Sequence, residues 1–310
     1  MRILFIDSVH SVISESFVAL EWTCDFCYEE SKEVITSKIH DYDGIIIRSR
    51  FKLDAEFLRK ASQLKFIGRP GAGLENIDTD FCTRNNIEVF RSPEGNRDAV
   101  SEHIIGSLLM LFNNLKIADS EVRQGIWKRE ENRGLELMGK TIGIIGFGYM
   151  GAAFAQRLQG FGARILSYDK YKSNYAPDYV TEVSLETLKS EVDIISLHIP
   201  QTAETIGMVN KEFISSIQKP FYLINSARGK SVKLEDLVEG IKSNKVLGAC
   251  LDVLEYESSS FENAGFETDT FQYLAKSNKT VLTPHIAGWT HEAQLKMGVF
   301  LKDKIISKFG

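Results

Sequence analysis

A glycine-rich segment in the middle of the chain has the spacing of a dinucleotide-binding loop. Gly146, Gly148 and Gly151 form a G-x-G-x-x-G sequence between an expected strand at 141–145 and an expected helix at 152–158. The first glycine permits a tight turn, the second lets the backbone approach a pyrophosphate, and the third allows close packing of helix on strand. The helix N-terminus presents free N–H groups and a positive dipole end to the phosphates.

An acidic residue follows this loop at the distance expected of such a site. Asp169 ends the next expected strand, at 164–168, and can accept hydrogen bonds from the adenosine ribose hydroxyls. It would repel a 2′-phosphate, since two unit charges about 4 Å apart at an effective dielectric of about 20 repel by roughly 4 kcal/mol. Lys170 and Lys172 can offset part of that repulsion. The sequence therefore predicts NAD, favoured over NADP but not exclusively.

The composition is that of an ordinary globular protein. At about 150 residues per domain, 310 residues suggest two domains. The chain is 43% hydrophobic and 25% charged, which argues against disordered, collagen-like or membrane-embedded classes. A net charge of −5 without a basic stripe predicts no nucleic-acid partner. Asp7 ends the N-terminal apolar run before the roughly 7–15 residues of a signal peptide, so we expect a cytoplasmic protein.

The cysteines predict neither a disulfide framework nor a metal site. Cys24, Cys27, Cys82 and Cys250 are few and scattered. Cys24 and Cys27 form a C-x-x-C, but no second Cys or Cys/His pair follows at zinc-site spacing. We expect reduced thiols and no bound metal.

Strand-like and helix-like patterns alternate along the chain, which predicts an α/β architecture with parallel sheets. From Asp98, a candidate N-cap, apolar residues recur at helical spacing as far as Leu115. This long helix is a candidate crossing between domains. The expected strands are at 2–6, 44–48, 65–68, 88–90, 141–145, 164–168, 194–198, 221–225, 248–251 and 280–282, and a last helix is expected at 290–309.

Three further segments give the chain a family resemblance. Asn-Ser-Ala-Arg-Gly at 225–229, Leu-Asp-Val-Leu-Glu-Tyr-Glu at 251–257 and Thr-Pro-His-Ile-Ala-Gly at 283–288 follow the glycine loop in order. Together with that loop they resemble the motifs of the D-isomer-specific 2-hydroxyacid dehydrogenases. The N-terminal half agrees, with matching segments at 48–52, 68–78 and 96–102, and the resemblance spans nearly the whole chain.

The resemblance implies the interconversion of 2-keto acids and D-2-hydroxy acids. This chemistry needs a cation for the carboxylate and a proton donor at the carbonyl. Arg228 suits the first role, because a guanidinium grips a carboxylate with two hydrogen bonds. His285 suits the second, since an imidazole titrates near pH ~6.5. Glu257 would orient His285, fix its tautomer and favour the imidazolium, while in oxidation the neutral ring acts as the base.

The resemblance also implies residues around the cofactor and the substrate. His198 is expected to pack around the adenosine and to transfer no proton. The expected cofactor-binding residues are Gly146, Gly148, Tyr149, Met150, Gly151, Asp169, His198, Pro200, Thr205, Ser226, Ala227, Asp252, Ala287, Gly288 and Val100. The expected substrate-binding residues are Arg48, Ser49, Ala72 and Gly73 (the last two through backbone N–H groups), Arg228 and His285.

Three positions depart from the family pattern. Ser258 stands where proline usually follows the catalytic glutamate, and the polar segment 258–279 between Glu257 and His285 is longer than in many relatives. Pro70 stands where alanine is common. These differences could reshape the substrate pocket.

The substrate is the least determined part of the sequence interpretation. Residues 48–52 resemble the segment that faces the phosphate in D-3-phosphoglycerate dehydrogenases, and Arg69 and 127–129 have counterparts there. We expect a short form of that enzyme, without a regulatory domain, acting on 3-phosphoglycerate and phosphohydroxypyruvate in serine biosynthesis. Alternatively, Arg50, Lys52, Lys128 and Arg129 are surface charges, and the protein is a hydroxypyruvate/glyoxylate reductase or a D-lactate-type dehydrogenase. An alternative of another class is an NAD(H)-sensing, corepressor-like binding protein.

The resemblance implies two Rossmann-like or flavodoxin-like domains, each a doubly wound parallel sheet, with the active site in the cleft between them. Residues 1–98 with 288–310 would form the substrate-binding domain, and 99–287 the NAD-binding domain. Ligands of such sheets bind beyond the carboxyl ends of the strands. The family resemblance further predicts a homodimer through the nucleotide-binding domain.

Overall fold

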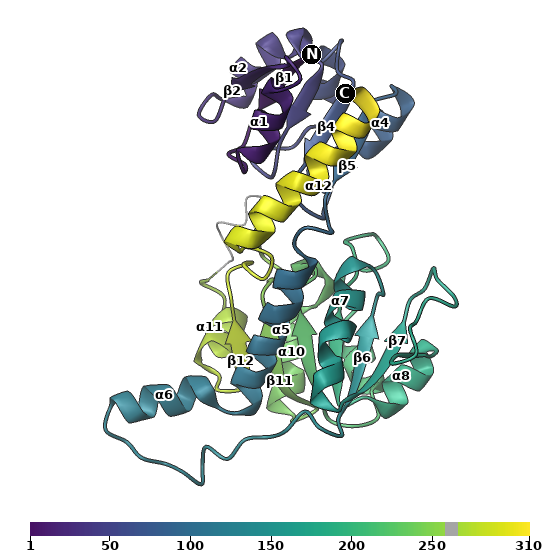
Figure 1. Ribbon diagram of the computed structural model, residues 1–310. Coiled ribbons are helices and arrows are strands. Elements are labelled where there is room, and N and C mark those ends of the chain that lie inside the picture. The colour runs from purple at the N-terminus through teal and green to yellow at the C-terminus, as the bar shows by residue number, and fades with distance from the viewer. Residues whose placement is uncertain (258–265) are drawn as a thin grey trace. The chain divides into compact units, whose positions relative to one another are not determined.

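The computed structural model describes residues 1–257 and 266–310. The chain forms two compact units, Met1–Arg97 with Trp289–Gly310 and Asp98–Gly288, and each unit is built on its own parallel sheet (Figure 1). None of the described helices has both the length and the apolar character needed to cross a membrane.

The first unit is a five-stranded parallel sheet with helices on both faces. Successive residues of β1 point to opposite faces, so Leu4 joins one core cluster and Ile3 and Phe5 join the other. The strand order is β2-β1-β3-β4-β5, the flavodoxin-like order. The strands are β1 (Arg2–Phe5), β2 (Thr23–Phe26), β3 (Gly44–Ile46), β4 (Phe66–Arg69) and β5 (Glu88–Arg91).

The helices of the first unit cover the two apolar faces of this sheet. Buried residues of α2 (Lys32–Lys38), α3 (Ala55–Lys60) and α4 (Thr79–Arg84) pack on the face that holds Leu4. Those of α1 (Val12–Val18) and α12 (His291–Phe309) pack on the opposite face. The C-terminal helix is therefore part of the core of the first unit, which is assembled from both ends of the chain.

The second unit has a seven-stranded parallel sheet in the order β12-β11-β10-β9-β6-β7-β8. Its chain runs outward from β6 to β8, then returns to β9 on the other side of β6 and continues to β12. The carboxyl ends of β6 and β9 therefore flank a topological switch point, where such sheets bind ligands. The strands are β6 (Thr141–Ile145), β7 (Arg164–Tyr168), β8 (Thr181–Glu182), β9 (Ile194–Leu197), β10 (Phe221–Asn225), β11 (Val246–Leu251) and β12 (Thr280–Leu282).

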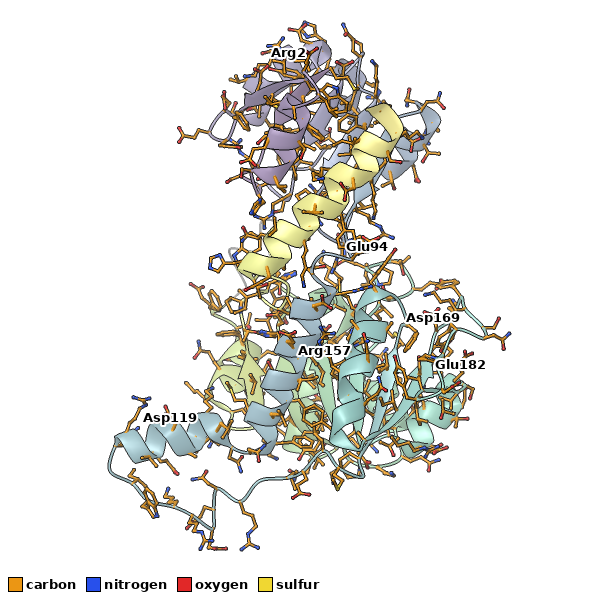
Figure 2. The ribbon with its side chains drawn as sticks, viewed as in Figure 1. Arg2, Glu94, Asp119, Arg157, Asp169 and Glu182 are labelled. Carbon is orange, nitrogen blue, oxygen red and sulfur yellow. The ribbon has the colours of Figure 1, made fainter. Side chains whose placement is uncertain are left out.

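Helices cover both faces of this sheet as well. On one face α5 (Arg97–Phe112) and α7 (Tyr149–Leu158) pack on Ile142 and Ile144 of β6. Arg157 of α7 ties the two helices together by donating to Asp98 at 2.9 Å (Figure 2). The opposite face carries α8 (Leu185–Glu191), α9 (Lys211–Ser216), α10 (Leu234–Lys242) and α11 (Asp269–Lys276). Two parallel sheets with helices on both faces confirm the predicted fold class.

The long helix predicted from Asp98 to Leu115 differs from the structure at both ends. Asp98 lies in the first turn of α5 and is not its N-cap, because the helix already begins at Arg97. The helix stops at Phe112, and Asn114 adopts the left-handed conformation (φ 51°) before α6 (Leu115–Arg123) begins. Asparagine tolerates that conformation better than most residues. The apolar spacing continues across this break, and for that reason the prediction extended the helix to Leu115.

Gly95 packs closely against the backbone of the C-terminal helix. A Cβ on Gly95 would lie 2.5 Å from the Cα of Met297 in α12 and closer still to its backbone nitrogen. Gly95→Ala should lower the free energy of unfolding by about 1–3 kcal/mol through overpacking. Gly106→Ala in α5 is the matched control, because a Cβ there meets nothing within 4 Å and alanine favours helix by about 1 kcal/mol. Urea unfolding of both variants checks this, and equal effects would contradict it.

Candidate active site

Two of the three glycines in the G-x-G-x-x-G loop are required by packing, and the third faces open space. Gly146 follows β6 with φ +92°, and a Cβ there would lie 2.5 Å from the carbonyl oxygen of His198. A Cβ on Gly151 would overlap the carbonyl oxygen of Gly146. A Cβ on Gly148 meets nothing within 4 Å. The backbone of Gly148 is therefore open to a ligand that approaches closely.

The helix after this loop begins without a side-chain cap. Gly148 is the N-cap of α7, it makes no side-chain hydrogen bond, and the first turn holds no acidic residue. The N–H groups and positive dipole end of a helix start attract an anion when the chain supplies none itself. The residues present therefore fit the pyrophosphate of a dinucleotide.

Asp169 is tied to this loop by one hydrogen bond and to its own turn by another. It directly follows β7, and its two carboxylate oxygens accept from the N–H of Phe147 at 2.8 Å and of Tyr171 at 3.0 Å (Figure 2). Lys170 pairs with Glu204 at 2.7 Å, and Lys172 donates to the carbonyl oxygen of Phe147. The charge of Lys170 is thus paired with a carboxylate, whereas Lys172 binds a neutral carbonyl oxygen and keeps its charge near Asp169.

The residues expected beside the adenosine share the loop that follows β9. Thr205 donates from its hydroxyl to the carbonyl oxygen of Pro200 at 2.7 Å. The ring of His198 packs against Phe154 with ring centres 5.5 Å apart, and its Nε2 lies 2.8 Å from the Ser196 hydroxyl. Burial lowers the pKa of His198 to about 3. The ring is therefore neutral near pH 7 and suited to packing, not to proton transfer.

A tight loop after β10 presents Arg228. Asn225 closes this loop by accepting from the N–H of Ala227 at 3.1 Å and donating to the carbonyl oxygen of Arg228 at 3.0 Å. The next residue, Gly229, packs against the backbone of Leu254 so closely that a Cβ would overlap its carbonyl oxygen. The Arg228 loop is thus held against the turn that contains Glu257.

Ser226 has a buried hydroxyl that finds no hydrogen-bond partner among the described residues. It lines a small pocket together with His103, Asn225, Cys250 and Asp252. Buried polar groups are normally satisfied, so a hydroxyl of this kind is suited to a bound ligand. This fits the expected position of Ser226 at the nicotinamide end of a cofactor. Val100, also expected there, is buried in the core cluster under α5.

Asp252, at the end of β11, organises the segment that carries His285. Its side chain is 3% exposed. One carboxylate oxygen accepts from the Thr283 hydroxyl at 2.6 Å and from the N–H of Ile286 at 2.9 Å, and the other accepts from the N–H of Ala287 at 2.9 Å. This carboxylate therefore fixes the turn in which the expected cofactor residue Ala287 lies, and Gly288 comes directly after it.

Glu257 and His285 are in direct contact. The Nδ1 of His285 lies 2.9 Å from one Glu257 carboxylate oxygen, and the other oxygen accepts from the N–H of Leu254 at 2.5 Å. A carboxylate at Nδ1 requires a proton on Nδ1, so Nε2 is the ring atom that can exchange a proton. His285 has φ 55°, and hydrogen bonds from its N–H to the carbonyl oxygens of Asp252 and Thr283 hold this conformation.

In the first unit, Asp7 organises the loop that holds two expected substrate residues. Its carboxylate accepts from the N–H groups of Arg48, Ser49 and Arg50 at 2.5, 3.0 and 3.3 Å. The Arg48 guanidinium stacks on the ring of Trp289, 3.9 Å from its centre. The N–H groups of this guanidinium, unlike the backbone N–H of Arg48, make no hydrogen bond or ion pair with the rest of the described chain. Burial lowers the pKa of Arg48.

The remaining residues considered for substrate binding, from both units, differ in their surroundings. The backbone N–H groups of Ala72 and Gly73 have no acceptor within residues 1–257 and 266–310, so they are available for an anion. Arg50 points inward and donates to the carbonyl oxygens of Ile6, Cys27 and Glu30. Arg50 is therefore a partly buried cation held by backbone carbonyl oxygens. Lys52, Lys128 and Arg129 are exposed, and Lys128 pairs with Glu121.

Sequence reasoning missed three supporting residues. Asp7 could have been found, because it is a polar residue at the carboxyl end of a buried parallel strand. His103 and Trp289 carry no comparable signal, since His103 is one of the polar residues within an apolar helix pattern and Trp289 lies beyond the last recognised motif. Ser258 lies outside the described residues. Of the polar segment 258–279, the structure describes 266–279, which include α11.

Comparisons with known proteins point to one family. Residues 105–287 match the family model of the D-isomer specific 2-hydroxyacid dehydrogenase, NAD binding domain. The D-3-phosphoglycerate dehydrogenase of Archaeoglobus fulgidus is 37% identical over 279 residues, which are 89% of this chain and 51% of that protein. The hydroxypyruvate reductase of Thermotoga maritima is 34% identical over 281 residues, which are 90% of this chain and 89% of that protein.

A solved structure extends the likeness to the whole fold. The D-lactate dehydrogenase from Aquifex aeolicus, complexed with NAD and lactic acid, superimposes with a TM-score of 0.85 at 28% identity, covering 99% of this chain and 95% of that one. The chain spans about half the length of the D-3-phosphoglycerate dehydrogenases that it matches. The NAD predicted from the glycine loop agrees with the family description. The chain therefore belongs to the D-isomer-specific 2-hydroxyacid dehydrogenases, and residues 105–287 are its NAD-binding domain.

Proposed function

We propose that the protein is an NAD-dependent oxidoreductase that interconverts a D-2-hydroxy acid and its 2-keto acid. The observation that carries this proposal is the contact of Glu257 with His285 at 2.9 Å, on a frame that also holds Arg228. NAD, when bound, accepts or supplies the hydride at C2 of the substrate.

The three side chains divide the remaining work. Arg228 binds the substrate carboxylate with its planar guanidinium. His285 gives the proton on Nε2 to the carbonyl oxygen in reduction and takes it from the hydroxyl in oxidation. Glu257 keeps the proton on Nδ1, so that Nε2 is the exchanging atom in both directions.

We further propose that the substrate pair is 3-phosphoglycerate and phosphohydroxypyruvate, in serine biosynthesis. Support comes from curated relatives of that name at 32–37% identity. The Arg48 guanidinium, with no ion-pair partner among the described residues, also favours a substrate with a second anionic group. Hydroxypyruvate reduction is the second candidate, because the Thermotoga enzyme is matched over 89% of its length.

We also propose a cytoplasmic location, because the four free cysteines suit a reducing compartment.

The substrate is tested by NADH consumption. Purified protein is assayed with phosphohydroxypyruvate, hydroxypyruvate, glyoxylate and pyruvate, each with NADH and with NADPH. We expect the highest kcat/KM with phosphohydroxypyruvate and with NADH. A preference for hydroxypyruvate would replace the first candidate by the second. Binding of NADH without reduction of any of the four acids would contradict the proposed activity.

The proton-transfer role of His285 is tested by substitution. His285→Gln should lower kcat by about 10²–10⁴-fold, because a positioned proton donor contributes that much to the rate. His40→Gln is the matched control, since the His40 side chain is 56% exposed in the first unit. The control should keep wild-type kinetics. Similar rates for His285→Gln and the control would contradict the role.

We also propose a homodimer formed through the nucleotide-binding domain. The helix α6 has no buried residue, and in Figure 1 it and the stretch after it extend away from the layers of the second unit. The exposed apolar residues there are Leu115, Val122, Ile126, Trp127 and Leu135, and Trp127 is 81% exposed. Large exposed apolar surfaces of this kind mark interfaces.

The dimer is tested by sedimentation. The wild type should sediment at twice 34.9 kDa, and Trp127→Glu should shift it toward the monomer by placing a charge in the interface. Tyr171→Glu is the control, since Tyr171 is 79% exposed and lies away from α6 in the sequence. A wild type at 34.9 kDa would exclude the dimer.

A further inference from the structure

His103 lies on the helix α5, yet it contacts the turn that carries the proposed proton donor. Its Nε2 is 3.0 Å from the Thr283 hydroxyl oxygen and 3.7 Å from a carboxylate oxygen of Asp252. The neighbouring residue Ile104 is buried in the core under α5, which fixes the helix that carries His103. The imidazole is therefore delivered from a rigid element and not from a flexible loop.

The direction of each hydrogen bond in this cluster can be assigned. An ionised carboxylate can only accept, so the Thr283 hydroxyl donates its single proton to Asp252 at 2.6 Å. With that proton used, the Thr283 oxygen can only accept from His103. The Nε2 of His103 must therefore carry a proton. The result is a chain of donors that runs from His103 through Thr283 to the Asp252 carboxylate.

This chain of hydrogen bonds ends at the backbone of the His285 turn. The same carboxylate binds the N–H groups of Ile286 and Ala287. The carbonyl oxygen of Asp252 accepts from the N–H of His285 at 2.7 Å. The turn needs such support, because His285 has a positive φ, a conformation that persists only when its surroundings enforce it.

We propose that His103 is a positioning residue for the reaction, acting on His285 through Thr283 and Asp252. The inference rests on the proposed function, in which His285 exchanges the proton with the substrate. His103 touches neither His285 nor Glu257. Its N–H fixes the Thr283 hydroxyl and, through it, the orientation of the carboxylate that sets the path of residues 285–287.

The removal of this N–H should reduce turnover more than binding. A misplacement of about 1 Å at a reacting group can cost about 100-fold in rate. His103→Leu should therefore lower kcat by about 10- to 100-fold, with KM for the preferred 2-keto acid changed by less than about threefold. Thr283→Val breaks the same chain at its next member and should give the same pattern.

Conservative variants separate positioning from simple packing. A glutamine can place its amide N–H₂ near the position of the imidazole Nε2, so His103→Gln should stay within about threefold of the wild-type kcat. Thr283→Ser keeps the hydroxyl and should do the same. Both positions act through one carboxylate, so their effects should not add. The kcat of the double variant His103→Leu/Thr283→Val should lie within about threefold of the kcat of the slower single variant.

Steady-state kinetics and thermal unfolding of these variants decide the proposal. A wild type that reduces no 2-keto acid would overturn the proposed function, and this inference with it. An active wild type with His103→Leu and Thr283→Val both within threefold of its kcat would overturn this inference alone. So would equal losses for His103→Gln and His103→Leu, because that result would indicate a packing role. Should His103→Leu fail to fold, the Thr283→Val and Thr283→Ser pair gives the same comparison.

Discussion

The buried carboxylate of Asp252 is the group on which the candidate active site depends. A charge that is taken out of water is costly unless hydrogen bonds replace its hydration. Here that replacement comes from one hydroxyl and two backbone N–H groups of residues 283–287. The backbone after β12 must therefore follow the geometry of this carboxylate, and the orientation of His285 is set before any substrate binds.

Backbone contacts also connect the other parts of the site. In the second sheet, β10, β11 and β12 are neighbours, so the segments with Arg228, Asp252 and His285 all leave the sheet at one edge. Gly229 then brings the Arg228 loop against the backbone of Leu254, and Leu254 binds Glu257 through its N–H. Three side chains that are far apart in the sequence are thus connected through backbone contacts.

The sequence predicted those features that depend on local constraints. The glycine loop could be recognised because a tight turn and close packing restrict residue type at Gly146 and Gly151. The parallel strands could be recognised because they are buried on both faces. The contact of Glu257 with His285 was expected from the resemblance, and the structure brings the two together. The strands β2 and β8 were missed, because their sequences, Thr-Cys-Asp-Phe and Thr-Glu, contain no continuous apolar run.

Other features could not be predicted because they depend on contacts between distant segments. Nothing local distinguishes Arg50, which donates to three backbone carbonyls, from Arg48, which stacks on Trp289. The break after Phe112 depends on the left-handed Asn114, and the apolar spacing across it continues undisturbed. His103 gained meaning only when the structure placed Thr283 beside it.

The left-handed backbone of His285 also restricts how this protein can change over evolutionary time. Of the residues that carry a side chain, asparagine, aspartate and histidine adopt positive φ most readily, and β-branched residues adopt it least. A lineage that no longer needed proton transfer could therefore drift to asparagine or glycine at this position with its fold intact. Drift to valine or threonine would cost stability as well as activity. In an inactive descendant of this chain, asparagine or glycine at position 285 would therefore indicate that the left-handed backbone of the former catalytic histidine had been kept.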